Sequence, residues 1–336
     1  MKVHAPGKLI LSGEHAVVYG QPALAMAVNR YVTATAAPQL LPLVSFDLSD
    51  LAYEHGLTFT ALNRLKSRIK QKYQRFMTGD FTIRDVLQKP VELAQFAFTL
   101  FLETLNLKLT QGIRIRIQSD IPMGCGMGSS AATVLSIVHA IAHHLRVDIS
   151  SDIFFRLGLE AENMQHGYSS GLDLRVSLHG GCILVKGGEI YQREVPSLPM
   201  YLINTGMPKT TTGECVLHAA PHFKTSRLGD EFAAVTMAMD EGLQLNNALA
   251  IKEAMRANHE LLVNIGVVPE NVQHFIQEVE KFQGAAKICG AGAVAGDKAG
   301  VVLVITDNIT ELAELCARYH YTILPITGES RGVHVA

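Results

Sequence analysis

Residues 121–132 read IPMGCGMGSSAA, with three alternating glycines between a strand-like run and a helix-like one. Glycine lacks a Cβ and adopts positive φ readily, so successive backbone N–H groups can turn inward and cradle an anion. The apolar run from Ser129 to Leu145 predicts a buried helix whose positive dipole end lies at the same place. This stretch therefore favours a phosphate ligand, although a tight turn packed against a neighbour would also use glycines.

The spacing of the glycines excludes two common nucleotide-binding loops. A dinucleotide-binding loop has the pattern G-x-G-x-x-G, whereas Gly128 here comes one position early. A Walker A loop requires Gly-Lys-Ser/Thr, and the chain contains no such tripeptide. A different phosphate-binding loop is the remaining hypothesis.

The hydroxyls of Ser129 and Ser130 strengthen that hypothesis, because a hydroxyl at a phosphate-binding helix start can ligate Mg²⁺ or donate to a phosphate oxygen. Mg²⁺ also requires a carboxylate, and Glu160, Glu162 and Asp173 are the nearby acids in the sequence. On a helical wheel Glu160 lies nearer the core face than Glu162, so periodicity alone does not select the ligand.

Two further residues have chemistry suited to phosphoryl transfer. Asp173 ends the segment HGYSSGLD, which predicts a glycine-bounded turn, and its carboxylate could accept a proton from a substrate hydroxyl or simply cap the turn. Lys8 follows Pro-Gly at a predicted strand start, a position that by itself is more typical of a surface lysine. Together these residues indicate nucleotide-dependent phosphoryl transfer.

Composition limits the class of protein. With 336 residues, two packed domains are expected rather than one. The net charge of −2 gives no reason to expect a nucleic-acid surface. Five cysteines without any CxxC pair indicate neither a zinc site nor a disulfide framework and favour the reducing cytoplasm. No uncharged apolar run approaches the roughly 18 residues of a membrane span, so no membrane association is expected.

A basic segment is the one local exception to this balance. Residues 64–75 carry six Lys or Arg and no acid, on a helix whose predicted buried side carries Leu62, Leu65, Ile69, Tyr73 and Phe76. A solvated helix face is the simpler interpretation. An electropositive rim that attracts phosphorylated ligands is the alternative.

Strands and helices are intermixed along the chain without a regular βαβ repeat, which predicts an α+β fold. Strands are expected at 9–11, 28–36 and 113–118, and helices over much of 57–105. PSLP at 196–199 is the most linker-like tetrapeptide, and a strand pattern restarts after it. We therefore predict an N-terminal domain over 1–196 and a C-terminal domain over 197–336.

Three segments together resemble the GHMP kinases, a family of small-molecule kinases whose glycine-rich loop has the form PxGxGxGSSAA. Residues 122–132 match that form throughout. APGKLILSGEHAVVYGQPAL at 5–24 and AENMQHGYSSGLD at 161–173 are most similar to the mevalonate kinases of this family. The resemblance implies ATP-dependent phosphorylation of mevalonate to 5-phosphomevalonate in isoprenoid precursor synthesis. It also implies a two-domain fold, with a ribosomal-protein-S5-like N-terminal domain on a five-stranded sheet and a ferredoxin-like C-terminal domain.

The resemblance also implies roles for residues of this sequence. Glu162, with Ser130, would hold Mg²⁺, while Lys8 and Asp173 would flank the acceptor hydroxyl, Asp173 as base or as electrostatic partner. The substrate would be contacted by Glu14 and His15, which would line the acceptor pocket, and by Gly290 and Ala291 in the C-terminal glycine motif. The nucleotide would contact the glycine loop at Pro122, Gly124, Gly126, Gly128, Ser129, Ser130 and Ala131.

The sequence departs from the family pattern at three places. Leu174 follows Asp173 where asparagine is common, and Ala293 to Ala295 interrupt the C-terminal glycine run. A substrate-contacting threonine region falls at NTGMPKTTTGE, 204–214, without identifying which of Thr210 to Thr212 corresponds, and Lys209 there is an extra cation.

Two other functions stay open at this stage. One is a kinase of the same family with another acceptor, such as phosphomevalonate or a sugar, which extra cations near the acceptor would favour. The other is a non-catalytic nucleotide-binding protein, against which the joint presence of Lys8, Ser130, Glu162 and Asp173 argues. Members of the family are often dimers, so the resemblance is compatible with a homodimer, alongside a small-molecule substrate.

Overall fold

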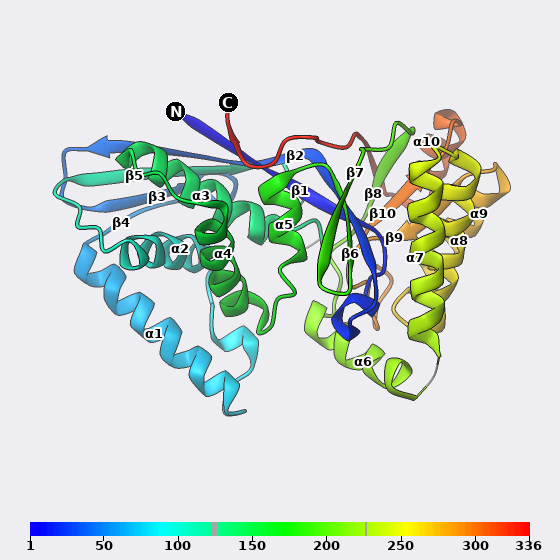
Figure 1. Ribbon diagram of the computed structural model, residues 1–336, viewed down its shortest axis with the longest axis horizontal. Helices are drawn as coiled ribbons and strands as arrows, with labels where there is room; N and C mark the ends of the chain where they lie inside the picture. Colours follow the sequence, from blue (N-terminus) through cyan, green and yellow to red (C-terminus); the bar gives the residue numbers. More distant parts are fainter. Residues whose placement is uncertain (123–125, 226) are drawn as a thin grey trace.

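The computed structural model describes residues 1–122, 126–225 and 227–336, and it is built on two β-sheets with helices packed on them (Figure 1). It confirms the predicted α+β class. Within these residues the first sheet has eight strands, in the order β12-β1-β2-β5-β3-β4, with β6 paired to β2 and β7 paired to β6. Their bounds are β1 Lys2–Ser12, β2 Ala23–Gln39, β3 Val44–Leu48, β4 Tyr53–Leu57, β5 Gly112–Ser119, β6 Cys182–Lys186, β7 Glu189–Arg193 and β12 His334–Val335.

The first sheet is larger than the five strands that the resemblance implied. One addition is the β6–β7 hairpin, whose strands are joined by Gly187 and Gly188, both at positive φ. A two-residue glycine loop suits a tight hairpin, because both central residues need positive φ there. The other addition is β12, which pairs antiparallel with β1 and brings the chain terminus back to the first sheet.

The helices of the first half cover this sheet on one side (Figure 1). They are α1 Phe59–Met77, α2 Pro90–Thr104, α3 Ser129–Leu145, α4 Ser151–His166 and α5 Leu172–His179, with the short 3₁₀ turns η1 Ala16–Tyr19, η2 Ser49–Leu51 and η3 Ile83–Asp85. α3 begins and ends where the sequence predicted, and its Ala131, Leu135 and Ile141 are fully buried. It packs on β1 and β2 between the sheet and α2 and α4, which explains why its sequence is apolar nearly all round.

The second sheet has four antiparallel strands in the order β11-β8-β10-β9. These strands are β8 Met200–Gly206, β9 Ala285–Ile288, β10 Gly300–Ile305 and β11 Thr322–Ile326, and the helices of this part are α6 Thr212–Thr225, α7 Leu228–Gln244, α8 Ala248–Asn264, α9 Glu270–Lys281 and α10 Ile309–Tyr319. One face of the sheet packs on α7 and α8 and joins the core of the first sheet, and the other packs on α9 and α10.

The predicted boundary at 196/197 falls between β7 and β8, and the division into two domains stays a prediction. The segment after β11 runs back along the first sheet, where Glu329 N–H donates to Ala27 O. This tail and β12 therefore belong spatially with the first sheet.

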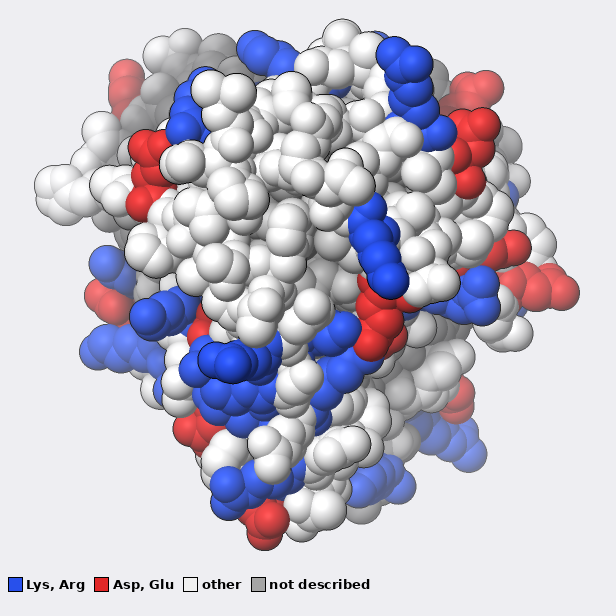
Figure 2. Space-filling view, turned by 90° about the vertical axis from the view of Figure 1, so that its left-hand side faces the viewer, with Lys and Arg blue, Asp and Glu red and all other residues white. Residues whose placement is uncertain are grey.

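The basic segment forms most of α1, which lies at the outer edge of the molecule (Figure 1), and Lys and Arg side chains gather on that face (Figure 2). Leu62 and Ile69 are buried, as the helical pattern predicted. Several of its cations are paired: Lys66 and Lys70 with Glu103, and Arg68 with Glu92. Among the described residues, no helix is long and apolar enough to span a bilayer.

Candidate active site

Lys8 and Asp173 form an ion pair where β1 meets the start of α5. The Lys8 Nζ lies 3.1 Å from Asp173 Oδ1. Lys8 is only 3% exposed, so the expectation of a surface lysine was wrong, because α3 and α5 pack on β1. Asp173 lies in the first turn of α5 rather than in a turn before it, and 30% of its side chain is exposed. A buried ammonium therefore faces an accessible carboxylate.

The end of the glycine loop lies directly on this pair. Gly128 has φ +70° and caps α3, and a Cβ built on it would stand 2.9 Å from Lys8 Cγ and 3.5 Å from Asp173 Oδ2. Lys8 N–H also donates to Met127 O at 2.9 Å. Any side chain at 128 would be strained in backbone and would collide with Lys8, so glycine is needed to bring the start of α3 against Lys8 and Asp173.

The two glycine segments of the sequence meet in space. A Cβ on Gly126, which has φ +73°, would lie 3.1 Å from Cys289 O and 3.3 Å from Gly290 Cα. Gly126 belongs to the loop before α3, whereas Gly290 follows β9 of the second sheet. The close backbone approach places the C-terminal glycine motif beside the predicted phosphate loop. Gly124, also predicted to contact the nucleotide, lies outside the described residues.

Ser130 and Glu162 lie together beside the start of α3. Glu162, on α4, is 2% exposed, and its Oε1 has no hydrogen-bond partner. Burial raises the pKa of this carboxyl, with His166, Ser130 and Lys8 opposing the rise and Asp173 adding to it. The Ser130 hydroxyl is hydrogen-bonded to His166 Nε2 at 3.1 Å, and this nitrogen lies 3.9 Å from Glu162 Oε1. An orphaned, buried carboxylate oxygen next to a hydroxyl is suited to a small hard cation.

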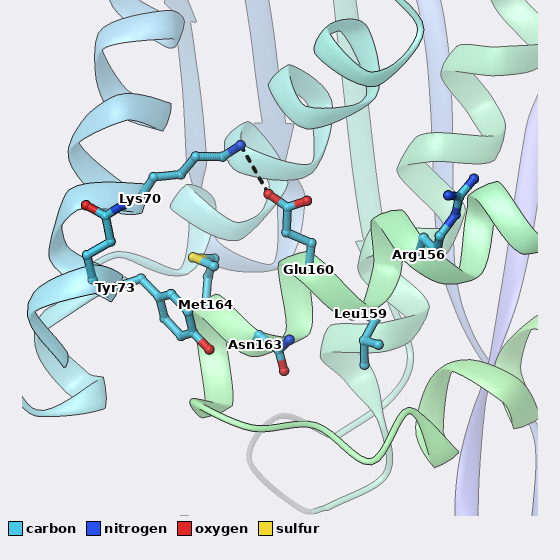
Figure 3. Close-up of a pocket in the computed structure, with 8 residues that line it drawn as sticks. Lys70, Tyr73, Arg156, Leu159, Glu160, Asn163 and Met164 are labelled. Carbon is cyan, nitrogen blue, oxygen red and sulfur yellow. Dashed lines mark ion pairs between the residues drawn. The ribbon is translucent and has the colours of Figure 1, made fainter. Parts of the chain in front are cut away.

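Glu160 points away from this cluster, so the helical-wheel ranking of the two glutamates was wrong. Glu160 is partly exposed and pairs with Lys70 Nζ at 3.1 Å, beside a hollow of about 450 Å³ between α1 and α4 (Figure 3). Tyr73, Leu159, Asn163 and Met164 also line this hollow, which contains no candidate site residue other than Glu160. The wheel misjudged α4 because α1, α3 and α5 all pack around that helix.

Glu14 lies at the junction of the two sheets. Its Oε1 pairs with Lys287 Nζ of β9, and the same ammonium donates to Ile10 O at 3.1 Å. Lys287 is fully buried. Burial raises the pKa of the Glu14 carboxyl, which Lys287 opposes, and Glu14 Oε2 has no partner.

His15 joins the same junction from the next position. Its Nε2 lies 3.0 Å from Ala291 O, in the C-terminal glycine motif, and its Nδ1 is buried without a partner. Burial lowers the pKa of His15 to about 4, so the imidazole is neutral at pH 7. Glu14 and His15 thus each present one unpaired polar atom while holding the second sheet in place.

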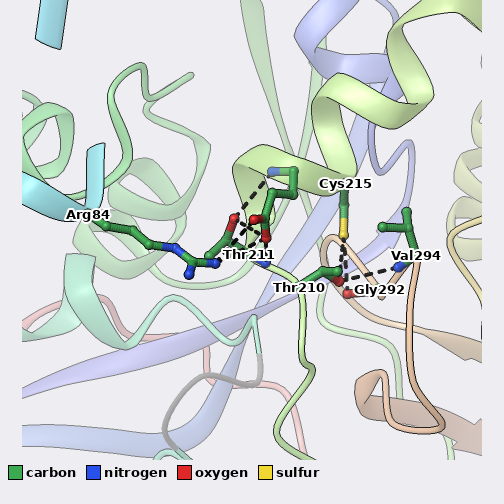
Figure 4. Close-up of polar contacts among 7 residues, drawn as sticks. Arg84, Thr210, Thr211, Cys215, Gly292 and Val294 are labelled. Atoms are coloured by element: carbon green, nitrogen blue, oxygen red, sulfur yellow. Dashed lines mark hydrogen bonds and ion pairs between the residues drawn. The ribbon is translucent and has the colours of Figure 1, made fainter. Parts of the chain in front are cut away.

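The threonine segment is held to the C-terminal glycine motif and to the first half of the chain (Figure 4). Thr210 Oγ1 accepts from Val294 N–H at 3.3 Å and lies 3.4 Å from Cys215 Sγ. Thr211 caps α6 by bonding Glu214, whose carboxylate pairs with Arg84 of η3 at 3.1 Å. The pair spans the two halves of the chain at the surface.

Most of the residues predicted from the sequence therefore gather in one region. The structure brings together Lys8, Gly126, Gly128, Ser130, Glu162 and Asp173, with Pro122, Ser129 and Ala131 beside them in the chain, and Glu14, His15, Gly290 and Ala291 adjoin through the second sheet. Sequence reasoning missed two residues of this region. His166 is one helical turn after Glu162 on the same face, a spacing that could have identified it, whereas Lys287 is paired only by tertiary contact.

Comparison with known proteins identifies the class. Residues 92–181 match the family model described as GHMP kinases N terminal domain. This segment holds the glycine loop, α3, α4 and α5. The resemblance predicted from the sequence is confirmed.

Relatives similar over most of the chain are mevalonate kinases. The chain is 26% identical over 318 residues to a mevalonate kinase of Methanocaldococcus jannaschii, covering 93% of this chain and 94% of that protein. It is 29% identical over 297 residues to the mevalonate kinase of Archaeoglobus fulgidus, covering 87% and 89%.

Solved structures agree on the fold. The mevalonate kinase of Methanococcus jannaschii superimposes with a TM-score of 0.81 at 24% identity, over 98% of both chains. The L. major mevalonate kinase in complex with R-mevalonate gives a TM-score of 0.73 at 20% identity, over 99% of this chain and 97% of that one.

Proposed function

We propose that this protein is an ATP-dependent kinase that phosphorylates mevalonate to 5-phosphomevalonate. The observation that carries the proposal is the Lys8–Asp173 pair at 3.1 Å directly under Gly128, where a phosphate-binding loop ends. Binding a nucleotide alone would not need an accessible carboxylate and a buried ammonium at that point. Relatives with the name mevalonate kinase, similar over nearly the whole chain, support the choice of acceptor.

Each group of the site has a part in phosphoryl transfer. The glycine loop and the free N–H groups in the first turn of α3 hold the phosphates of ATP. Asp173 orients the acceptor hydroxyl and takes its proton as the oxygen attacks the γ-phosphorus, and ADP leaves. Lys8 offsets the negative charge that develops on the attacking oxygen.

Ser130 and Glu162 are the residues that would hold Mg²⁺, and the unpaired Glu162 Oε1 fits such an ion. In a kinase the ion neutralises charge on the β- and γ-phosphates. No group of three or more His, Cys, Asp or Glu side chains within the described residues could hold a metal, so phosphate oxygens and water would complete the coordination.

Glu14 and His15 are placed to contact the acceptor. Glu14 Oε2 and His15 Nδ1 are adjacent in the chain, buried and unpaired, and a hydroxylated acid could satisfy both. Ala291, which accepts from His15 when its Nε2 is protonated, links this pocket to the C-terminal glycine motif. A cytoplasmic enzyme and a homodimer are part of the same proposal.

The test is ADP release from ATP and Mg²⁺ with mevalonate, phosphomevalonate, homoserine or galactose as acceptor. We expect turnover with mevalonate and a loss of at least about a hundredfold in Asp173→Asn, the low end for a positioned proton acceptor. Asp152→Asn, an exposed aspartate in the first turn of α4, is the matched control and should keep full turnover. Turnover confined to another acceptor would refute the substrate, and an active Asp173→Asn would refute the site.

A further inference from the structure

His166 occupies a position that the proposed function does not use. It is the last residue of α4, and 38% of its side chain is exposed. Gly167, with φ +85°, ends the helix, and Tyr73 O–H donates to Gly167 O at 2.8 Å, which fixes this end of α4 against α1. The imidazole is therefore held at a fixed helix end and is partly exposed to solvent.

The Nε2 atom of His166 lies near both proposed metal ligands. It is 3.1 Å from Ser130 Oγ and 3.9 Å from the unpaired Glu162 Oε1. Ser130 lies in the first turn of α3, where backbone N–H groups favour anions. One nitrogen thus adjoins the helix start suited to phosphate and the carboxylate suited to the cation.

In the tautomer that carries the proton on Nε2, His166 donates to Ser130 Oγ, and this hydrogen bond competes with metal ligation. A hydroxyl oxygen that gives a lone pair to Mg²⁺ becomes a poorer acceptor, so the imidazole N–H then needs another partner. A non-bridging phosphate oxygen carries negative charge and is a stronger acceptor than a neutral hydroxyl. The phosphate oxygens of a metal-bound nucleotide at the proposed site would be such acceptors.

We propose that His166 is a further nucleotide-binding residue, whose Nε2–H transfers from the Ser130 hydroxyl to a phosphate oxygen when the metal–nucleotide complex binds. This inference rests on the proposed nucleotide site, not on the identity of the acceptor. It makes the contribution of His166 to nucleotide affinity dependent on the metal.

The test is equilibrium binding of the non-hydrolysable β,γ-imido analogue of ATP, with Mg²⁺ and with EDTA. We expect His166→Ala to weaken binding about ten- to a hundredfold with Mg²⁺, as for a hydrogen bond to a charged group, and to change it little with EDTA. His166→Gln places an amide N–H near the position of Nε2 and should restore most of the affinity. His274→Ala, on an exposed face of α9, is the control and should bind as the wild type does.

A second readout does not depend on affinity. The electron paramagnetic resonance spectrum of Mn²⁺ in the ternary complex should differ between wild type and His166→Ala, because the hydrogen bond to the Mn²⁺-bound phosphate is lost. Equal losses of affinity with and without metal would show a structural role and overturn the inference, as would no loss at all. Thermal unfolding checks that each variant is folded, and His166→Gln decides the question if His166→Ala is not.

The outcomes separate the two proposals. A wild-type protein that phosphorylates mevalonate while His166→Ala binds normally overturns the role of His166 alone. If His166→Ala loses affinity only with metal and the wild type phosphorylates no acceptor of the panel, the acceptor assignment is overturned. His166 then remains a nucleotide contact.

Discussion

Glu14 and Glu162 are both buried carboxylates next to the candidate site, but the charged groups around them differ. Glu14 has a permanent counter-ion in the buried Lys287. Among the described residues, Ser130 and His166 lie beside Glu162, and Glu162 Oε1 has no hydrogen-bond partner. Because an uncompensated buried charge is costly, a fold retains one only where something else compensates it. Glu14 thus joins the two sheets, whereas Glu162 is suited to an exchangeable cation.

The largest expected effect comes from breaking the permanent pair. Lys287→Met leaves Glu14 buried without a counter-ion, so the free energy of unfolding should fall by about 3–5 kcal/mol. Urea unfolding measures this change in the free energy of unfolding. The double variant Lys287→Met with Glu14→Gln removes both charges and should recover a large part of the loss. A single variant as stable as wild type would show that the pair does not hold the sheets together.

Removing the charge of Glu162 should change the free energy of unfolding in the opposite direction. Without metal, Glu162→Gln replaces a buried carboxylate by a neutral amide, and we expect the free energy of unfolding to rise by about 1 kcal/mol. The same variant should lose the extra stability that Mg²⁺ and ATP give the wild type. Urea unfolding with and without these ligands measures both.

Glu160→Gln is the matched control for that prediction, since it lies on the other face of the same helix and pairs with Lys70. It should leave stabilisation by Mg²⁺ and ATP intact. If Glu162→Gln were as strongly stabilised by the ligands as wild type, the assignment of Glu162 to the metal would be wrong.

The smallest effect is expected at the exposed pair between Arg84 and Glu214, which also joins the two halves of the chain. Arg84→Gln should change the free energy of unfolding by at most about 1 kcal/mol, because both side chains are mostly exposed and water screens them. Urea unfolding at low and high salt should show a difference from wild type only at low salt. A loss as large as that of Lys287→Met would contradict the distinction between buried and exposed pairs.

The sequence predicted local features well where one segment carries the whole signal. The alternating glycines and the apolar run after them identified α3 from Ser129 to Leu145, and the pattern MYLINTG identified β8 at Met200–Gly206. The sequence predictions were wrong where the tertiary surroundings of a residue decide its burial or its secondary structure. Lys8 is buried because α3 and α5 pack on β1, and α5 begins at Leu172 in a segment that sequence alone presents as a turn.

Sequence by itself predicted the α+β class and the resemblance to the GHMP kinases, because glycine spacing, hydroxyls and apolar periodicity are properties of contiguous residues. Only the tertiary structure decided that Lys287 neutralises Glu14 and that His166 Nε2 lies near both Ser130 and Glu162. The physical reason is that burial and charge pairing depend on residues far apart in the chain, such as Glu14 and Lys287, and packing alone brings these together.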